Sequence, residues 1–289
     1  MPRKKNIKIY IYNFLLYNVK KRKAVKKMKI GFIGCGNMAN AIINGIIGAK
    51  VLEKNDIFAS DIEQNKLTQF CDDAEIHAAD NSAIATKCDI ILLAVKPQKF
   101  PEVLPKIANE LNDNQLIISI AAGKKIAFIE SCIGSHKIIR IMPNLNATIQ
   151  QSVSALCANS NCTQEDIAIT KKIFESIGVV FELEEERFSA FSAVACCSPA
   201  FSFMYIDALA KAGIACGLEE GCAYAAAAAS VIGSAEMLKQ STDTPQELIT
   251  KVCSPGGTTI EGVKVLKKKG LSETIAAAVN ASYEKDKTL

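Results

Sequence analysis

Tryptophan is absent from this chain of 289 residues, and aromatic residues make up only 6% of it. This scarcity argues against carbohydrate-binding and base-stacking surfaces, which are built on aromatic side chains. No uninterrupted apolar run reaches the ~18 residues that a membrane span needs, so we expect no membrane partner. Because 49% of the residues are nevertheless hydrophobic and 22% charged, the chain can bury sizeable cores and is not disordered.

Cysteine and histidine are present in a pattern that excludes two kinds of site. The eleven cysteines are an odd number, none forms a CxxC pair, and the chain has only two histidines. A disulfide framework or a zinc module needs paired, regularly spaced ligands. We therefore predict no metal, and a reducing, cytoplasmic location.

A net positive charge is lacking outside the first 27 residues. Residues 1–27 hold ten of the 34 Lys and Arg and none of the 30 Asp and Glu, so the remainder has 24 basic and 30 acidic residues. An acidic body does not predict nucleic-acid binding. The basic segment has two Arg, no Ser and no small-residue cleavage site, which does not fit a transit or signal peptide. A basic amphipathic membrane-surface helix is an alternative, but we expect a dispensable extension before a natural start at Met28.

From Met28 onward the pattern alternates between short apolar strands and amphipathic helices. Alternation of this kind is typical of a doubly wound α/β domain, and we predict a Rossmann-like domain over residues 28–184. The first expected strand is a short buried one between Met28 and the glycine turn, and the others are 56–60, 88–95, 115–120, 136–142, 153–158 and 178–183. The expected helices follow the glycine turn near residue 36, then lie near 63–70, after Pro97, near 124–132 and over 164–176, the last with Thr163 as its N-cap.

Beyond Glu184 the strands cease and five helices are expected. Their predicted ranges are 186–215, 219–241, 244–253, 257–269 and 271–286, punctuated by glycine and proline. Residues 223–238 are dense in alanine, and small residues allow helices to approach closely. A helical region of this size has more apolar surface than it can bury alone, so we predict an all-α domain over residues 185–289 that forms a homodimer.

The segment Gly34–Ala39, GCGNMA, matches the dinucleotide fingerprint G-x-G-x-x-G/A. The first glycine permits a tight turn, the second lets backbone approach a pyrophosphate, and the small third residue lets helix and strand pack. A predicted strand precedes the motif and a helix follows it, which is the context that the motif requires. The alternative is a glycine turn without a ligand.

Asp61 follows the second expected strand. A carboxylate there accepts hydrogen bonds from the adenosine ribose and repels the 2′-phosphate of NADP. Ser60 suits either cofactor, and Lys66 is the nearest base. The alternative reading makes Asp61 a helix N-cap, so the choice between NADPH and NADH stays open.

Two further strand ends supply candidate residues at the edge where parallel sheets bind ligands. Lys96, within Ala94–Pro97, is either an electrostatic partner of the cofactor or a solvated loop residue. The small residues of Ser119–Gly123 leave room for a flat ring, or merely give clearance between helix and sheet.

A glycine-rich turn, SPGGTT, occupies Ser254–Thr259 between two expected helices. Backbone N–H groups at a helix N-terminus form an anion site, and threonine hydroxyls both donate and accept hydrogen bonds. That chemistry suits a small carboxylate that carries a nitrogen. The alternative is an interhelical turn with Thr258 or Thr259 as N-cap.

Taken together, these motifs resemble the pyrroline-5-carboxylate reductase family. The resemblance extends from Met28 to the C-terminus and rests on these segments: GFIGCGNMA (31–39), AVKPQ (94–98), SIAAG (119–123), RIMPN (140–144) and VCSPGGTT (252–259). It implies an enzyme that reduces 1-pyrroline-5-carboxylate to L-proline with NADPH or NADH, the last step of proline biosynthesis. It also implies a homodimer of interleaved helical domains, with dimers often assembled into a decamer.

The resemblance assigns roles position by position. The implied cofactor-binding residues are Ile33, Gly34, Cys35, Gly36, Asn37, Met38, Ser60, Asp61, Asn81, Ala94, Val95, Lys96, Pro97, Ile120, Ala121 and Ala122. The implied substrate-binding residues are Glu185, Lys251, Val252, Ser254, Gly257, Thr258 and Thr259. Backbone amides of the SPGGTT turn would bind the carboxylate, and Thr259, the implied catalytic residue, would reach the ring nitrogen.

Three departures from the family pattern bear on substrate range. Residues 189–200 read SAFSAVACCSPA where the family usually has an aspartate at the first position and glycines before the proline. Leu145 and Asn146 replace a Thr-Pro pair, and Lys251 replaces a smaller polar residue. The alternatives are a related two-domain imine, hydroxyacid or F420-dependent reductase, and a non-catalytic dinucleotide-binding protein.

Overall fold

The computed structural model describes residues 28–288, and the expectations for residues 1–27 lie outside them. The described chain divides into two compact units. The sheet unit runs through Cys197 and takes in the residues from Ser282 onward, and the helical unit is Ser198–Ala281. Each unit is described by itself below.

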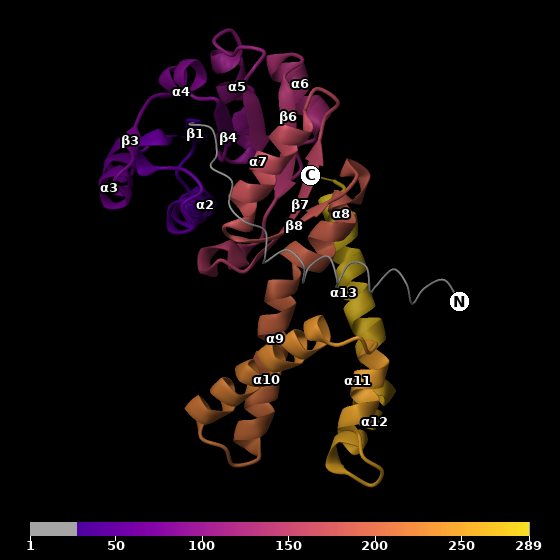
Figure 1. Cartoon of the computed structure of the whole chain (residues 1–289). Helices are drawn as coiled ribbons and strands as arrows, with labels where there is room; N and C mark the ends of the chain where they lie inside the picture. The colour runs from indigo at the N-terminus through magenta and orange to yellow at the C-terminus, as the bar shows by residue number, and fades with distance from the viewer. Residues whose placement is uncertain (1–27, 289) are drawn as a thin grey trace. The chain divides into compact units, whose positions relative to one another are not determined.

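The sheet unit contains a single eight-stranded sheet of order β3-β2-β1-β4-β5-β6-β7-β8 (Figure 1). Strands β1 to β6 pair in parallel, β6 and β7 pair antiparallel, and β7 and β8 pair in parallel. The strands are β1 (Ile30–Ile33), β2 (Ile57–Ser60), β3 (His77–Ala78), β4 (Ile90–Leu93), β5 (Leu116–Ser119), β6 (Lys137–Met142), β7 (Ser152–Ala158) and β8 (Gly178–Glu182).

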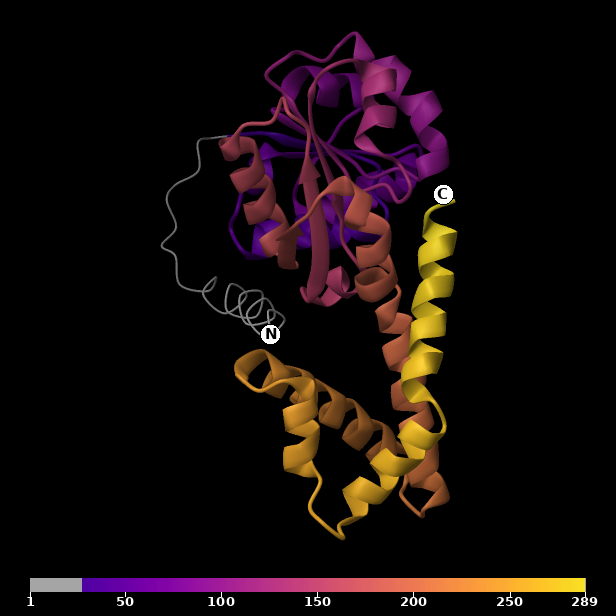
Figure 2. The same cartoon turned by 90° about the vertical axis from the view of Figure 1, so that its right-hand side faces the viewer.

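Helices cover both faces of this sheet (Figure 2). The helices are α2 (Asn37–Gly48), α3 (Gln64–Ala74), α4 (Asn81–Lys87), α5 (Phe100–Ala108), α6 (Ile126–Ile133) and α7 (Gln164–Glu175). The sequence explains why α7 begins where it does. The Thr163 side chain accepts the Asp166 N–H and the Asp166 carboxylate accepts the Thr163 N–H, which together form the capping box of the predicted N-cap.

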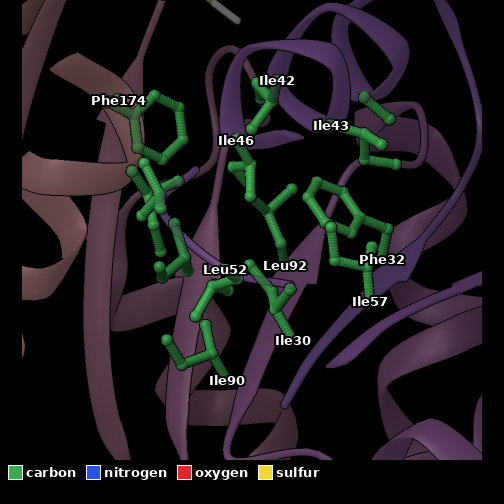
Figure 3. Packing of buried hydrophobic residues seen from close by; sticks show 14 of the residues in the cluster. Ile30, Phe32, Ile42, Ile43, Ile46, Leu52, Ile57, Ile90, Leu92 and Phe174 are labelled. Atoms are coloured by element: carbon green, nitrogen blue, oxygen red, sulfur yellow. The ribbon is translucent and has the colours of Figure 1, made fainter. Parts of the chain in front are cut away.

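Two cores lie on opposite faces because successive strand residues point to opposite sides. Ile90 and Leu92 of β4 pack in the cluster that contains α2, α3 and α7, whereas Ile91 and Leu93 pack in the cluster that contains α4, α5 and α6. Figure 3 shows Ile42 and Ile46 of α2 directed toward the strands of the first cluster. The apolar strand predicted at 88–95 is therefore buried on both faces, as central parallel strands are.

The predicted α/β class is confirmed, with three additions that the sequence pattern did not indicate. Strand β3 has only two residues, and helix α4 follows it with the Asp80 side chain as its N-cap. Strand β7 runs antiparallel to β6 because the connection between them, residues 143–151, is a short 3₁₀ turn. A parallel crossover needs a dozen or more residues.

The helical unit confirms the predicted all-α half. Its helices are α9 (Ser198–Ala215), α10 (Glu220–Gln240), α11 (Pro245–Val252), α12 (Thr258–Lys268) and α13 (Leu271–Asp286). Helices α9 and α10 pack together through the small buried residues Ala210, Ala223 and Ala227 (Figure 1). Large apolar side chains of this unit, such as Met204, 72% exposed, and Ile232, 65% exposed, are left largely uncovered by the described residues around them.

Within residues 28–288, two helical stretches are long and apolar enough to cross a membrane by length and composition alone, Glu185–Ala215 and Glu220–Gln240. The search for uninterrupted apolar runs missed them because isolated charges and polar residues interrupt both. Two such helices are weak grounds for a membrane assignment, and no membrane is part of the structure.

The boundary between the compact units follows Cys197, whereas the predicted domain boundary follows residue 184, near the end of β8. The reason is that Phe188 is buried in a small core with Met142 and Ala155 of the sheet. The single helix predicted over 186–215 is also more varied than expected. It consists of a 3₁₀ turn (Glu185–Arg187), α8 (Phe188–Phe191), a π-helical turn (Ser192–Cys196) and α9.

Candidate functional site

The candidate site of the sheet unit begins where β1 ends. Gly34 has a φ of +105°, and a Cβ built on it would lie 2.9 Å from the backbone of Ala94 and Val95. Its N–H donates to the Ser60 carbonyl at 2.8 Å. The ends of β1, β2 and β4 therefore meet at this residue, and only glycine fits there.

The second glycine of the motif has the opposite surroundings. A Cβ on Gly36 would meet no atom within 4 Å, and Gly36 is the N-cap of α2 with no side chain capping the helix. The third motif residue, Ala39, is fully buried against the sheet. An open backbone at an uncapped helix N-terminus fits the phosphates of a dinucleotide.

Asp61 reaches back to this phosphate loop. Its Oδ2 accepts the Cys35 N–H at 2.7 Å, and its Oδ1 accepts the Glu63 N–H at 3.0 Å. The alternative role as helix N-cap is wrong, because Glu63 is the N-cap of α3. The carboxylate is instead held by two backbone donors at the carboxyl edge of β2.

Ser60 and Asn81 form a second polar pair at the same edge. The Ser60 hydroxyl donates to Asn81 Oδ1 at 2.6 Å. Because the amide oxygen is thus engaged, the orientation of the Asn81 side chain is fixed and its NH₂ group remains as the donor. This pair supplies hydrogen-bond donors beside the Asp61 carboxylate.

These groups surround a cavity of about 680 Å³, a size that suits a small-molecule ligand. Its lining includes the predicted residues Ile33, Gly34, Ser60, Asp61, Asn81 and Val95. The other predicted cofactor residues are outside this lining: Cys35, Gly36, Asn37, Met38, Ala94, Lys96, Pro97, Ile120, Ala121 and Ala122. These residues lie in the segments that directly follow β1, β4 and β5.

The cavity also has a wall that the sequence reasoning missed. Lys99, Glu102, Val103 and Lys106 of the segment after β4 contribute to it, and both lysines pair with Glu102, at 3.0 and 3.5 Å. Their spacing of three and four residues on a helix, directly after a predicted strand end, is the signal that could have found them.

Lys96 and the 120–123 turn lie at the next strand ends. Lys96 is exposed. Ala121 is buried, its N–H donates to the Ser119 hydroxyl, and Gly123 has a φ of +70° that closes the turn before α6. The roles of these residues toward a cofactor stay predictions.

Glu185 has structural partners within the sheet unit. Its Oε1 accepts the Ile126 N–H at the start of α6 and the Arg140 Nη1 of β6, at 2.9 and 3.0 Å. The Arg140 guanidinium also lies 4.7 Å from the Phe188 ring centroid. Both charged side chains are mostly buried, 5% and 18% exposed. Sequence reasoning quoted Arg140 in RIMPN without a role, and the predicted contact of Glu185 with a ligand stays a prediction.

The SPGGTT turn of the helical unit has the expected backbone form. Gly256 has a φ of +72°, and a Cβ on Gly257 would lie 2.4 Å from the Ser254 hydroxyl oxygen. Gly257 is the N-cap of α12, so the alternative in which Thr258 or Thr259 caps the helix is wrong. Both threonines are exposed in its first turn, which leaves their hydroxyls and the first helical N–H groups for another partner.

Two other predicted substrate residues lie at the end of α11. Val252 is 62% exposed. Lys251 forms an ion pair with Asp243, which precedes α11. The lysine is therefore anchored beside the turn that it precedes.

Two buried thiols, Cys35 beside the phosphate loop and Cys196 in the π-helical turn, have raised pKa values. No group of three or more His, Cys, Asp or Glu within residues 28–288 could hold a metal ion. Burial raises the pKa of the Cys35 thiol to about 12, and the Asp61 carboxylate adds to the rise. Burial likewise raises the pKa of Cys196 to about 12. Thiols with such pKa values stay protonated and are poor nucleophiles.

Two family models match separate parts of the chain. Residues 185–289 match the model described as pyrroline-5-carboxylate reductase dimerisation. Residues 29–123 match the model described as NADP oxidoreductase, coenzyme F420-dependent.

Curated relatives cover almost the whole chain. A pyrroline-5-carboxylate reductase of Aquifex aeolicus is 38% identical over 263 residues, which are 91% of this chain and 97% of the relative. The Escherichia coli protein of the same name is 37% identical and covers 90% and 98%.

Solved structures agree over the same span. A Plasmodium falciparum pyrroline carboxylate reductase with NADP bound has a TM-score of 0.82, 31% identity, and coverage of 92% and 99%. The Coxiella burnetii pyrroline-5-carboxylate reductase has a TM-score of 0.86, 30% identity, and coverage of 91% and 98%. A prephenate dehydrogenase at 16% identity and a TM-score of 0.52 shares the fold alone.

The Arg140–Glu185 pair leads to a stability prediction. Glu185→Ala should leave a buried guanidinium without its carboxylate and reduce the free energy of unfolding by about 3–5 kcal/mol. The double variant Arg140→Met, Glu185→Leu should recover most of that loss, because a matched apolar pair carries no uncompensated charge. Urea unfolding at one fixed protein concentration measures both. A Glu185→Ala protein as stable as the parent would contradict a structural role for the pair.

Proposed function

Because this chain belongs to the pyrroline-5-carboxylate reductase family, we propose that it works through the residue roles set out below. Its reaction is the reduction of the cyclic imine 1-pyrroline-5-carboxylate to L-proline with NADH or NADPH, a step of proline biosynthesis. The observation that carries this assignment is the full-length match to relatives of that name, from bacteria, an archaeon and plants.

The sheet unit is proposed to hold the dinucleotide. Supporting this are the close approach at Gly34, the open backbone at Gly36 and the cavity beside Asp61 and Asn81. The cofactor, when bound, supplies the hydride that reduces the imine carbon. Ile120, Ala121 and Ala122 at the end of β5 are proposed to border its nicotinamide half, where small side chains leave room for a flat ring.

The SPGGTT turn is proposed to bind the substrate. The backbone N–H groups at the start of α12 suit the carboxylate, because a helix N-terminus favours an anion. Lys251, which is paired with Asp243, lies directly before the same turn. Thr259 is proposed to hydrogen-bond the ring nitrogen, since its hydroxyl is exposed and does not cap the helix.

This arrangement supports catalysis by positioning. Protonation of the imine nitrogen makes its carbon more electrophilic, and a cyclic imine can gain that proton from solvent near neutral pH. No histidine lies in the turn, so the chain is proposed to orient the ring and hold its carboxylate. Thr259 would then stabilise the nitrogen as it becomes an amine.

The reaction itself is tested by following nicotinamide absorbance with pyrroline-5-carboxylate. Rapid oxidation of at least one of NADH and NADPH is expected, with proline as the product by amino-acid analysis. Oxidation should need the imine, so omission of that substrate is the control. A protein that binds the cofactor but oxidises neither form would contradict the assignment.

Thr259→Ala should lower kcat roughly ten- to a few-hundredfold with a smaller change in KM, the scale of losing one positioned hydrogen bond. Thr259→Ser keeps the hydroxyl and should retain most of the activity. Thr274→Ala is the matched control, because the Thr274 hydroxyl donates to the carbonyl of Gly270, directly before its own helix, at 2.9 Å. Unchanged kinetics in Thr259→Ala would remove this residue from the mechanism.

The match of residues 185–289 to a dimerisation model supports a second copy of the chain as the partner of the exposed apolar helices. We propose that this copy, and not a membrane, covers them. Supporting this is the polar network on α9 and α10, in which Tyr224 and Lys211 both donate to Asp207, at 2.6 and 2.8 Å. Charged side chains are costly inside a bilayer.

A cytoplasmic location is proposed because the cysteines are free. No nucleic-acid partner is proposed, because the chain after residue 27 has more acidic than basic residues.

In detergent-free buffer, light scattering coupled to size exclusion should give a mass at least twice the 31.1 kDa of one chain. The same measurement distinguishes a dimer from the decamer that we propose as its further assembly. A monomer, or an aggregate dispersed only by detergent, would contradict the proposed cover.

A further inference from the structure

The contacts of Asp61 carry an inference about which cofactor the chain selects. The two carboxylate oxygens are each held by one backbone N–H, from Cys35 at 2.7 Å and from Glu63 at 3.0 Å. The Asp61 carbonyl also accepts the Gln64 side-chain amide at 2.7 Å. The carboxylate is therefore fixed at the cavity edge and cannot easily turn away from a bound ligand.

A carboxylate held in this way still has free lone pairs. Each oxygen offers about two acceptor sites, and the two backbone donors use one on each oxygen. Ribose hydroxyls, which donate, can fill the others. A 2′-phosphate offers only acceptors and carries a charge of about −1.5 to −2 at neutral pH, so it meets Asp61 as one anion meets another.

The other charges that line the cavity do not reverse this preference. Asp80 at the start of α4 adds another carboxylate, and the lysines of the lining, Lys99 and Lys106, are both paired with Glu102. On α3, Lys66 is exposed and outside the lining. The lining therefore holds three carboxylates, Asp61, Asp80 and Glu102, and only two lysines, both paired with Glu102, so no unpaired cation of the described lining is left to receive a phosphate.

We propose that Asp61 makes this chain select NADH over NADPH by accepting the adenosine ribose hydroxyls and repelling the 2′-phosphate. This inference rests on the proposed function, because it assumes that the cavity holds the adenosine half of the cofactor. The choice between NADH and NADPH would then depend on one side chain, which directly follows strand β2.

The test is equilibrium binding, which needs no turnover. Isothermal titration of the full chain with ADP-ribose and with 2′-phospho-ADP-ribose compares ligands that differ only in the phosphate. ADP-ribose should bind at least about tenfold more tightly, and the ratio should shrink as ionic strength rises. Equal binding, or tighter binding of the phosphorylated ligand, would overturn the inference. Failure of both ligands to bind would contradict the dinucleotide site itself.

Variants assign the effect to the residue. Asp61→Asn removes the charge and keeps an acceptor, so the ratio of the two affinities should fall about tenfold. Glu63→Gln is the matched control, since it removes the same charge two positions away, its side chain is outside the lining, and the ratio should stay within twofold. Asp61→Ser repeats the test if Asp61→Asn folds poorly by circular dichroism. An unchanged ratio in the folded Asp61 variant would overturn the assignment.

The main alternative to this inference is that Lys66 binds the 2′-phosphate of NADPH. If this lysine turned toward the cavity and bound a 2′-phosphate, Lys66→Ala would weaken 2′-phospho-ADP-ribose and leave ADP-ribose unchanged. We expect Lys66→Ala to change both affinities by less than twofold. A selective loss of the phosphorylated ligand would overturn the claim that no cation receives the phosphate.

Discussion

The close approach of Gly34 to the backbone of Ala94 and Val95 is the constraint on which the rest of the nucleotide site depends. It requires β1 to lie between β2 and β4, which is the observed strand order. Because the three strands are parallel, their carboxyl ends meet at one edge and bring Ser60 and Asp61 beside the loop. A side chain at residue 34 would push these strand ends apart. Every contact that the loop could make with a ligand therefore depends on this backbone geometry.

The same strand order explains why the site can be rigid. Alternate residues of β4 enter two separate cores, one beneath α2, α3 and α7 and one beneath α4, α5 and α6. Each strand end is thus anchored from both faces, and the loops that follow have little freedom. Hydrogen bonds then orient the side chains at these strand ends. The N–H groups of Cys35 and Glu63 hold the Asp61 carboxylate, and the Ser60 hydroxyl holds the Asn81 amide.

Elements with a strong local signal could be predicted from the sequence, whereas those fixed by tertiary contacts could not. The apolar run at 88–95 and the capping residue Thr163 each carry a local signal, and both predictions are confirmed. Strand β3 is two residues long and has no period to detect. The antiparallel direction of β7 depends on the length of one connection. The Arg140–Glu185 pair joins residues 45 positions apart, so no spacing rule could have indicated it.

The stretch at 189–198, whose residues depart from the family pattern, contains a π-helical turn that is held by hydrogen bonds of its backbone. The Cys197 N–H donates to the Ser192 carbonyl at 3.0 Å, which forms the π-helical turn. Asn144 fixes this turn to the sheet, because its side-chain amide donates to the Ala195 carbonyl at 2.9 Å and its oxygen accepts the Val153 N–H. Turns of this type are frequent at functional sites. Asn144 belongs to the RIMPN segment that carries the family resemblance. A residue that fits the family pattern therefore holds the backbone of a stretch that departs from it. These hydrogen bonds are made by backbone groups of the turn and by the Asn144 side chain, so they do not depend on which side chains residues 189–198 carry.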